Sequence, residues 1–218
     1  MRYEEPKSTY SLLLLLSVSA VIAYTYFRQI IQPNLAPMLE LHGQILQGIA
    51  PSPYRYRILV PYLTEIIKRV FSLFVDSGHA FLFAYVLYDF FSIFLLLVSL
   101  FKWLRVWFSS EQALVGVLFV AGTMPIALRD HYFQPWSFLE PVFFTLAFYA
   151  MFRKRYLFLA SIVLVASLNR ETALFIPLTF LLLNFQELVL SQALLDVCSA
   201  FWHTGAPSNF STERSPFR

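Results

Sequence analysis

The feature that most limits what this chain can fold into is a pair of long apolar stretches, residues 10–31 and 79–101. Each meets the roughly 20 residues that a helix needs to cross a bilayer. Four shorter apolar segments follow at 112–128, 138–152, 156–168 and 172–190. Charged residues make up 13% of the chain, against about 25% in a typical soluble domain. We therefore predict an all-α fold, a polytopic membrane helix bundle with about six membrane segments.

The membrane domain is predicted to cover residues 1–190, and a change in character predicts a separate, poorly ordered tail over 191–218. Lys and Arg tend to mark the cytoplasmic loops of membrane proteins. Six crossings divide these residues evenly between the two sides. The cluster of Arg153, Lys154 and Arg155 lies tight against two apolar segments, however, whereas the opposing charges are spread over a long loop. This asymmetry favours an integral membrane protein with a cytoplasmic N-terminus.

The long outer loop, residues 32–78, contains five prolines that interrupt regular structure. An amphipathic helix is predicted within it, over 63–74, lying flat in the membrane interface. Glu65 on its polar face is expected to pair with Lys68 and Arg69 as ordinary helix-surface pairs. The apolar face has a helical spacing and consists of Leu63, Ile66, Ile67, Val70, Phe71 and Phe74.

Arg55 and Arg57 alternate with tyrosines in the same loop, in the run "PYRYRILVP". A guanidinium offers a planar fork of donors that suits phosphate oxygens. The two arginines are therefore candidate substrate-binding residues. The alternative is that both simply anchor the chain at the lipid headgroups. Upstream, Glu40 is either a functional carboxylate or a solvated one.

A second polar cluster, "RDH" at 129–131, follows the third segment. Arg129 and His131 are candidate binding residues, and Asp130 is a candidate acid, although Arg129 and Asp130 can also neutralise each other. His131 has no His or Cys partner at metal-ligand spacing, so no metal site is predicted. Ser137 and Glu140 fit a capping box ahead of the next helix.

The third cluster, "NRET" at 169–172, ends a fifth segment that is short for a crossing. We expect Asn169 to cap the following helix and Glu171 to suit its dipole. Arg170 would lie below the outer surface and needs an acid, a phosphate or a water-filled cavity there, with Glu171 and Asp130 as the candidate acids. In the favoured topology all three clusters face the outer side. They would form a cationic cavity suited to a phosphate-bearing lipid, with Arg55, Arg57, Arg129 and Arg170 as its charges.

The segments "YRYRILVPYL" and "SLNRETALFIPL", together with the long first outer loop, resemble the C-type (GT-C) integral-membrane glycosyltransferases. The resemblance covers roughly residues 10–190 of a chain that is about half as long as usual members. It implies inverting transfer of a sugar from a polyprenyl-phosphate donor at the outer face of a bacterial inner membrane. Glu40 would be the catalytic base, and Arg55, Arg57 or Arg170 would hold the phosphate. Asp130 would be a second catalytic acid, serving the acceptor or a divalent cation.

Two other functions stay open. The chain could be a non-catalytic subunit that binds or transports a lipid phosphate or glycolipid together with a further membrane subunit. It could also be an inactive, partial copy of such an enzyme, packed among membrane lipids. Nucleic acid is not an expected partner, because the net charge of +3 comes from short basic clusters.

Overall fold

The computed structural model describes residues 8–127 and 134–185, and every regular element in these ranges is helical. The first apolar stretch forms α1 (Ser8–Tyr26), which continues into a π-helical turn, η1 (Phe27–Ile31). The other long stretch forms α4 (Ser77–Leu104). These two segments are long and apolar enough to cross a membrane. The prediction of an all-α fold is confirmed for the described residues.

The four shorter apolar segments are also helical. They form α5 (Ser110–Ala127), α6 (Leu139–Phe152), α7 (Tyr156–Ser167) and a last helix over residues 175–185. A 3₁₀ turn, η3 (Pro135–Ser137), precedes α6, and another, η4 (Glu171–Leu174), follows α7. The predicted tail, 191–218, lies outside the described residues.

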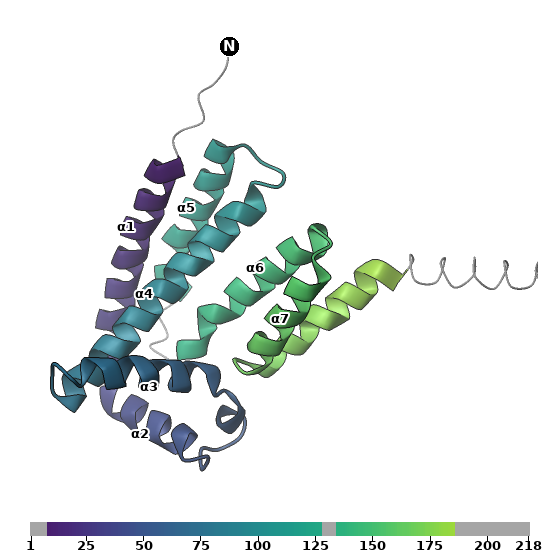
Figure 1. Cartoon of the computed structure of the whole chain (residues 1–218). Helices are drawn as coiled ribbons and strands as arrows, with labels where there is room; N and C mark the ends of the chain where they lie inside the picture. Colours follow the sequence, from purple (N-terminus) through teal and green to yellow (C-terminus); the bar gives the residue numbers. More distant parts are fainter. Residues whose placement is uncertain (1–7, 128–133, 186–218) are drawn as a thin grey trace, which may run out of the picture. The chain divides into compact units, whose positions relative to one another are not determined.

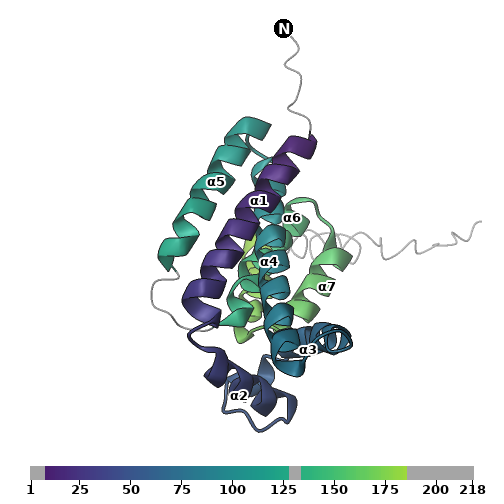
Figure 2. The same ribbon diagram turned by 90° about the vertical axis from the view of Figure 1, so that its left-hand side faces the viewer.

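Residues 32–78 are more regular than predicted. They contain α2 (Leu35–Leu46), the 3₁₀ turn η2 (Tyr54–Tyr56) and α3 (Leu59–Phe71). Figures 1 and 2 show α3 lying across the end of α4 rather than along it. The amphipathic helix predicted over 63–74 therefore exists as α3, but it begins and ends a few residues earlier.

The apolar face of α3 is turned away from the protein. Ile66 is 62% exposed and Phe74, just after the helix, is 80% exposed. The buried positions of α3 are Val60, Pro61 and Thr64, where the helix packs against α4. An amphipathic helix that leaves Ile66 and Val70 exposed suits a lipid surface better than water.

The chain divides into two units, Met1–Ile176 and Pro177–Arg218. In the first unit α4 is the central helix and contacts α1, α3, α5 and α6. Asp76 caps α4, accepting hydrogen bonds from the backbone N–H groups of Gly78 and His79 at 3.1 and 3.2 Å. In the second unit the described residues, 177–185, are helical.

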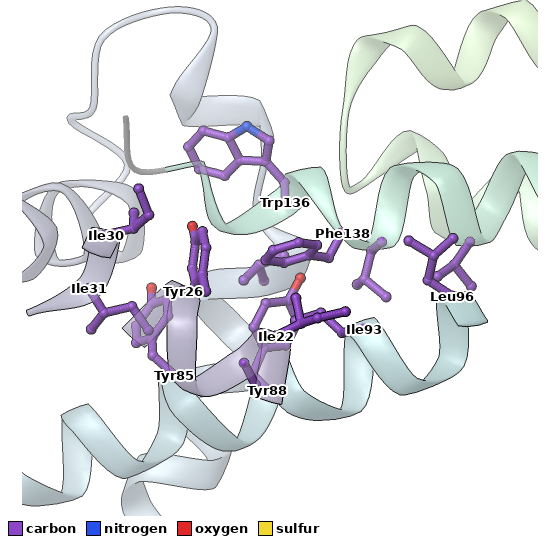
Figure 3. Close-up of a cluster of buried hydrophobic side chains, with 14 of the residues drawn as sticks. Ile22, Tyr26, Ile30, Ile31, Tyr85, Tyr88, Ile93, Leu96, Trp136 and Phe138 are labelled. Carbon is purple, nitrogen blue, oxygen red and sulfur yellow. The ribbon is translucent and has the colours of Figure 1, made fainter. Parts of the chain in front are cut away.

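The core lies between α1, α4 and the start of α6 (Figure 3). The rings of Tyr26 and Phe138 meet edge to face with centroids 4.9 Å apart. The Tyr88 hydroxyl donates to the backbone carbonyl of Pro135 at 2.8 Å. Trp136 is almost fully buried beside them. This packing holds η3, and with it the start of α6, against α4.

Candidate functional site: two interlocked ion pairs

Arg57 ends η2 and is buried, although it comes from the most polar part of the chain. Its guanidinium lies over the rings of Trp136 and Tyr54, 5.0 and 5.4 Å from their centroids. It also binds both carboxylate oxygens of Glu171, with Nε donating to Oε2 at 3.2 Å. A forked pair of this kind fixes orientation as well as charge.

Arg170 forms a second ion pair beside the first. Its Nη1 donates to Oε2 of Glu140 at 2.6 Å, and the Thr172 hydroxyl donates to the other oxygen of the same carboxylate. The expectation that Arg170 pairs with Glu171 or Asp130 is therefore wrong for Glu171, which binds Arg57 instead. We call Arg57, Glu140, Arg170 and Glu171 the ion-pair cluster.

Backbone contacts bring these distant segments together. The N–H of Leu59, at the start of α3, donates to the carbonyl of Leu168, at the end of α7, at 3.0 Å. The buried Asn169 side chain donates to the carbonyl of Trp136 at 3.1 Å. Asn169 thus ties η4 to η3, and its predicted role as a helix cap is wrong, because no side chain caps η4.

The capping box predicted at Ser137 and Glu140 is also wrong. The Ser137 hydroxyl donates to Oε1 of Gln134 at 3.2 Å, and Glu140 turns to Arg170 and Thr172. The sequence does contain a capping box, at Ser109 and Gln112, where each side chain bonds the other residue's N–H. Glu140 matches the same pattern in sequence, but a cation lies within its reach.

The ion-pair cluster carries no net charge, since two guanidinium groups face two carboxylates. The hydrogen bond from Arg57 lowers the pKa of Glu171, so that carboxylate is ionised near neutral pH. The cavity that Glu140, Asn169, Arg170 and Thr172 line measures only about 10 Å³, roughly one water molecule. The described residues thus leave little room at the two ion pairs and carry no net charge there, while Arg129, which the predicted cationic cavity includes, lies outside the described residues.

The remaining predicted site residues lie elsewhere or outside the described ranges. Glu40 is exposed on α2, where it accepts a hydrogen bond from Gln44 at 3.0 Å, and makes no contact with the ion-pair cluster. Arg55 is exposed too and donates to the Tyr56 hydroxyl at 2.6 Å. Three candidates, Arg129, Asp130 and His131, fall within 128–133, outside the described residues.

A second polar network joins α2, α3 and α4. His42 is buried between the Tyr85 hydroxyl, 2.9 Å from Nδ1, and Glu65, 3.3 Å from Nε2. Glu65 also binds Lys68 and Arg69 at 3.1 Å each, as predicted. Burial lowers the pKa of His42, despite the opposing effect of Glu65. Burial acts to raise the pKa of Glu65, but hydrogen bonds from its three partners outweigh it and lower the pKa.

Within residues 8–127 and 134–185, no three His, Cys, Asp or Glu side chains gather as a metal site would require. The two carboxylates of the ion-pair cluster already bind arginines, which leaves a divalent cation no pair of free oxygens there. The sequence analysis also missed Asp89, a fully buried carboxyl on α4 whose oxygens bond none of the described groups. A single acidic residue in the middle of the long apolar segment that forms α4 was the available signal.

Comparisons of the chain with protein-family models, with curated proteins and with solved structures gave no match.

Proposed function

We propose that this chain is a polytopic membrane protein that binds a lipid-linked phosphate at the ion-pair cluster. Two helical segments, Tyr10–Ile31 and Ser77–Leu104, have the length and hydropathy of membrane spans. Large apolar side chains are exposed along α1, α5 and α7 as well as on α3. A folded protein in water rarely leaves so much apolar surface uncovered, so a lipid environment is the simplest explanation.

The observation that carries the phosphate proposal is the unequal burial of Arg57 and Glu171. The arginine side chain is 8% exposed and lies against two rings that also contact each other, while its carboxylate partner is 53% exposed. Glu171 can therefore swing into water while the guanidinium stays in place. A phosphate offers the same forked pair of acceptor oxygens that the carboxylate offers.

Arg170 supports the same reading. Its Nε is buried and bonds no described group, although Nη1 binds Glu140. An anionic oxygen that reached this donor would give it a partner. An apolar groove of about 320 Å³ lies between α1, η1, α3 and α4, at the end of α3 that is farther from Arg57, and would take a distal part of an isoprenoid chain. Its walls include Phe27, Phe71 and Phe83.

Sugar transfer in the manner of the C-type glycosyltransferases is the second candidate. One observation favours it: the two segments that carry the resemblance, at Arg57 and at Asn169–Thr172, meet in the ion-pair cluster. The donor would be a polyprenyl-phosphate sugar. Glu40 would have to act from α2, outside the cluster, so binding is the function that the geometry supports best.

The test measures binding of geranylgeranyl phosphate to the detergent-solubilised chain. Glu171→Gln removes the carboxylate that competes with the phosphate for Arg57. Binding should strengthen about fivefold, because a partly exposed ion pair contributes about 1 kcal/mol. Arg57→Met should abolish binding, and Arg170→Met should weaken it. Arg28→Met is the matched control, because Arg28 is an exposed cation on η1, outside the cluster.

A Glu171→Gln variant that binds no more tightly than the wild type would refute displacement of Glu171 by phosphate. Equal losses in Arg28→Met and Arg57→Met would indicate general electrostatic attraction instead. Sugar transfer is tested by measuring how fast the wild type and Glu40→Gln release the lipid phosphate from a polyprenyl-phosphate sugar. Transfer predicts that release stops while binding is unchanged.

A further inference from the structure

A cleft at the opposite end of the helices gathers four basic side chains. It measures about 860 Å³ and lies between α1, α4, α6 and α7. Lys102 and Arg105 reach it from the end of α4, Arg153 from the end of α6 and Arg155 from the start of α7. We call these four residues and their surroundings the basic cleft.

The described residues that line the basic cleft, all within 8–127 and 134–185, include no acidic side chain. Arg153 lies 5.6 Å from the centroid of the Tyr149 ring, so this cation faces a neutral group. Four like charges around one opening repel each other and attract an anion. Ser11 and Ser99 add hydroxyl groups to the same lining.

Below the charges, the walls of the cleft are apolar. Leu15, Val98 and Leu146 line it along three different helices. With 28 residues α4 is about 42 Å long, whereas the hydrocarbon core of a bilayer is about 30 Å thick. The last turn of α4, with Lys102, would then lie at headgroup level while Val98 lies deeper. A cationic mouth above apolar walls matches an anionic amphiphile rather than a soluble ion.

We propose that the basic cleft binds the phosphate headgroup of an anionic membrane lipid, with the lipid's acyl chains against its apolar walls. This site is separate from the ion-pair cluster and does not depend on the function proposed there. It also gives the basic residues of the α4–α5 and α6–α7 turns a specific ligand, beyond their general effect on orientation.

The turn between α6 and α7 supplies a matched control. Arg153 and Arg155 line the cleft, and Lys154 between them does not. Lys154 has a positive φ of 53°, and the N–H groups of Lys154 and Arg155 bond the carbonyls of Met151 and Ala150, which closes the helix end. Lys154→Asn removes one charge from the same turn and keeps a residue type that tolerates this backbone conformation.

The experiment counts lipids that stay bound to the chain by native mass spectrometry, after release from micelles containing phosphatidylglycerol or phosphatidylcholine with the same acyl chains. We expect one phosphatidylglycerol retained per chain and little phosphatidylcholine. Arg153→Gln and Arg155→Gln should each weaken retention about fivefold, as expected for a basic residue near a lipid phosphate. Lys154→Asn should retain the lipid as the wild type does. All three positions are exposed, so the variants should fold, which circular dichroism checks.

Three results would overturn the proposal. Equal retention of the zwitterionic lipid would show that charge does not select the ligand. A loss in Lys154→Asn as large as in Arg153→Gln would show a diffuse surface effect. Complete displacement of phosphatidylglycerol by millimolar inorganic phosphate would show that the cleft binds a free anion and that its apolar walls contribute nothing.

Discussion

The Arg57–Glu171 pair predicts an asymmetry between two single substitutions. Glu171→Gln leaves a buried guanidinium without its counter-ion, a change that costs about 3–5 kcal/mol when both partners are fully buried. Arg57 keeps its contacts with the Trp136 and Tyr54 rings, however, each worth about 0.5–2 kcal/mol. The Gln amide oxygen also still accepts one hydrogen bond. We therefore expect Glu171→Gln to lower the free energy of unfolding by about 2 kcal/mol.

Arg57→Met should cost less, about 1 kcal/mol. The carboxylate it leaves behind is half exposed and regains water. A Met side chain also packs against the same two rings, and its sulfur–aromatic contacts offset the cation–π contacts that are lost. Because a loss of 1 kcal/mol lowers the melting temperature of a chain of this size by about 2–4 °C, we expect about 4–8 °C for Glu171→Gln and about 2–4 °C for Arg57→Met.

Thermal unfolding in detergent, followed by tryptophan fluorescence, measures both values. The double variant should be no less stable than Glu171→Gln alone, since the unpaired charge is gone. Glu111→Gln on α5 is the control and should change the melting temperature little, because Glu111 is exposed in a first helical turn. If Arg57→Met proved the more damaging single change, or if the two effects simply added, the assignment of a buried, ring-held cation with a displaceable partner would be wrong.

Three further outcomes are expected. Asp89→Leu should raise the melting temperature, because burying a carboxyl with no partner among the described residues costs about 1–3 kcal/mol of folding free energy. A lower melting temperature would reveal a partner of Asp89. Burial lowers the pKa of His42, so the free energy of unfolding should fall as the pH drops from 6.5 through that lowered pKa. His42→Gln should remove this acid sensitivity. His79→Gln changes an exposed histidine and should leave the acid sensitivity as in the wild type. In bilayer discs, a cysteine introduced at Ile66 of α3 should resist a water-soluble maleimide while one at Arg69 reacts; equal labelling would place α3 in water.

The helices were predictable because their signal is local. The six apolar segments and the amphipathic helix are readable from spacing and length, and each corresponds to a helix within a few residues, except that the end of the last segment lies outside the described residues. The start of α3 was harder to predict, since Ile58 precedes the helix without a side-chain cap and Pro61 lies in its first turn. The helix α2 was missed because Pro33 and Pro37 are typical of irregular structure. Proline is acceptable near a helix start, however, and Pro37 lies in the first turn of α2.

The partners within the ion-pair cluster were not predictable, for a physical reason that the residues illustrate. Arg170 and Glu171 are adjacent in sequence, but Arg170 has an extended backbone with φ −161° and ψ 148°, whereas Glu171 begins the 3₁₀ turn η4, so the two side chains leave the backbone in different directions. Adjacent opposite charges at such a position therefore bind different partners, here Glu140 and Arg57, which are 30 and 114 residues distant. The sequence could identify a polar turn that needed counter-charges, but only the tertiary packing of η3 against α4 decides which carboxylate lies beside which guanidinium. The same packing places Trp136 over Arg57, and that contact keeps the cation buried while its partner stays half exposed.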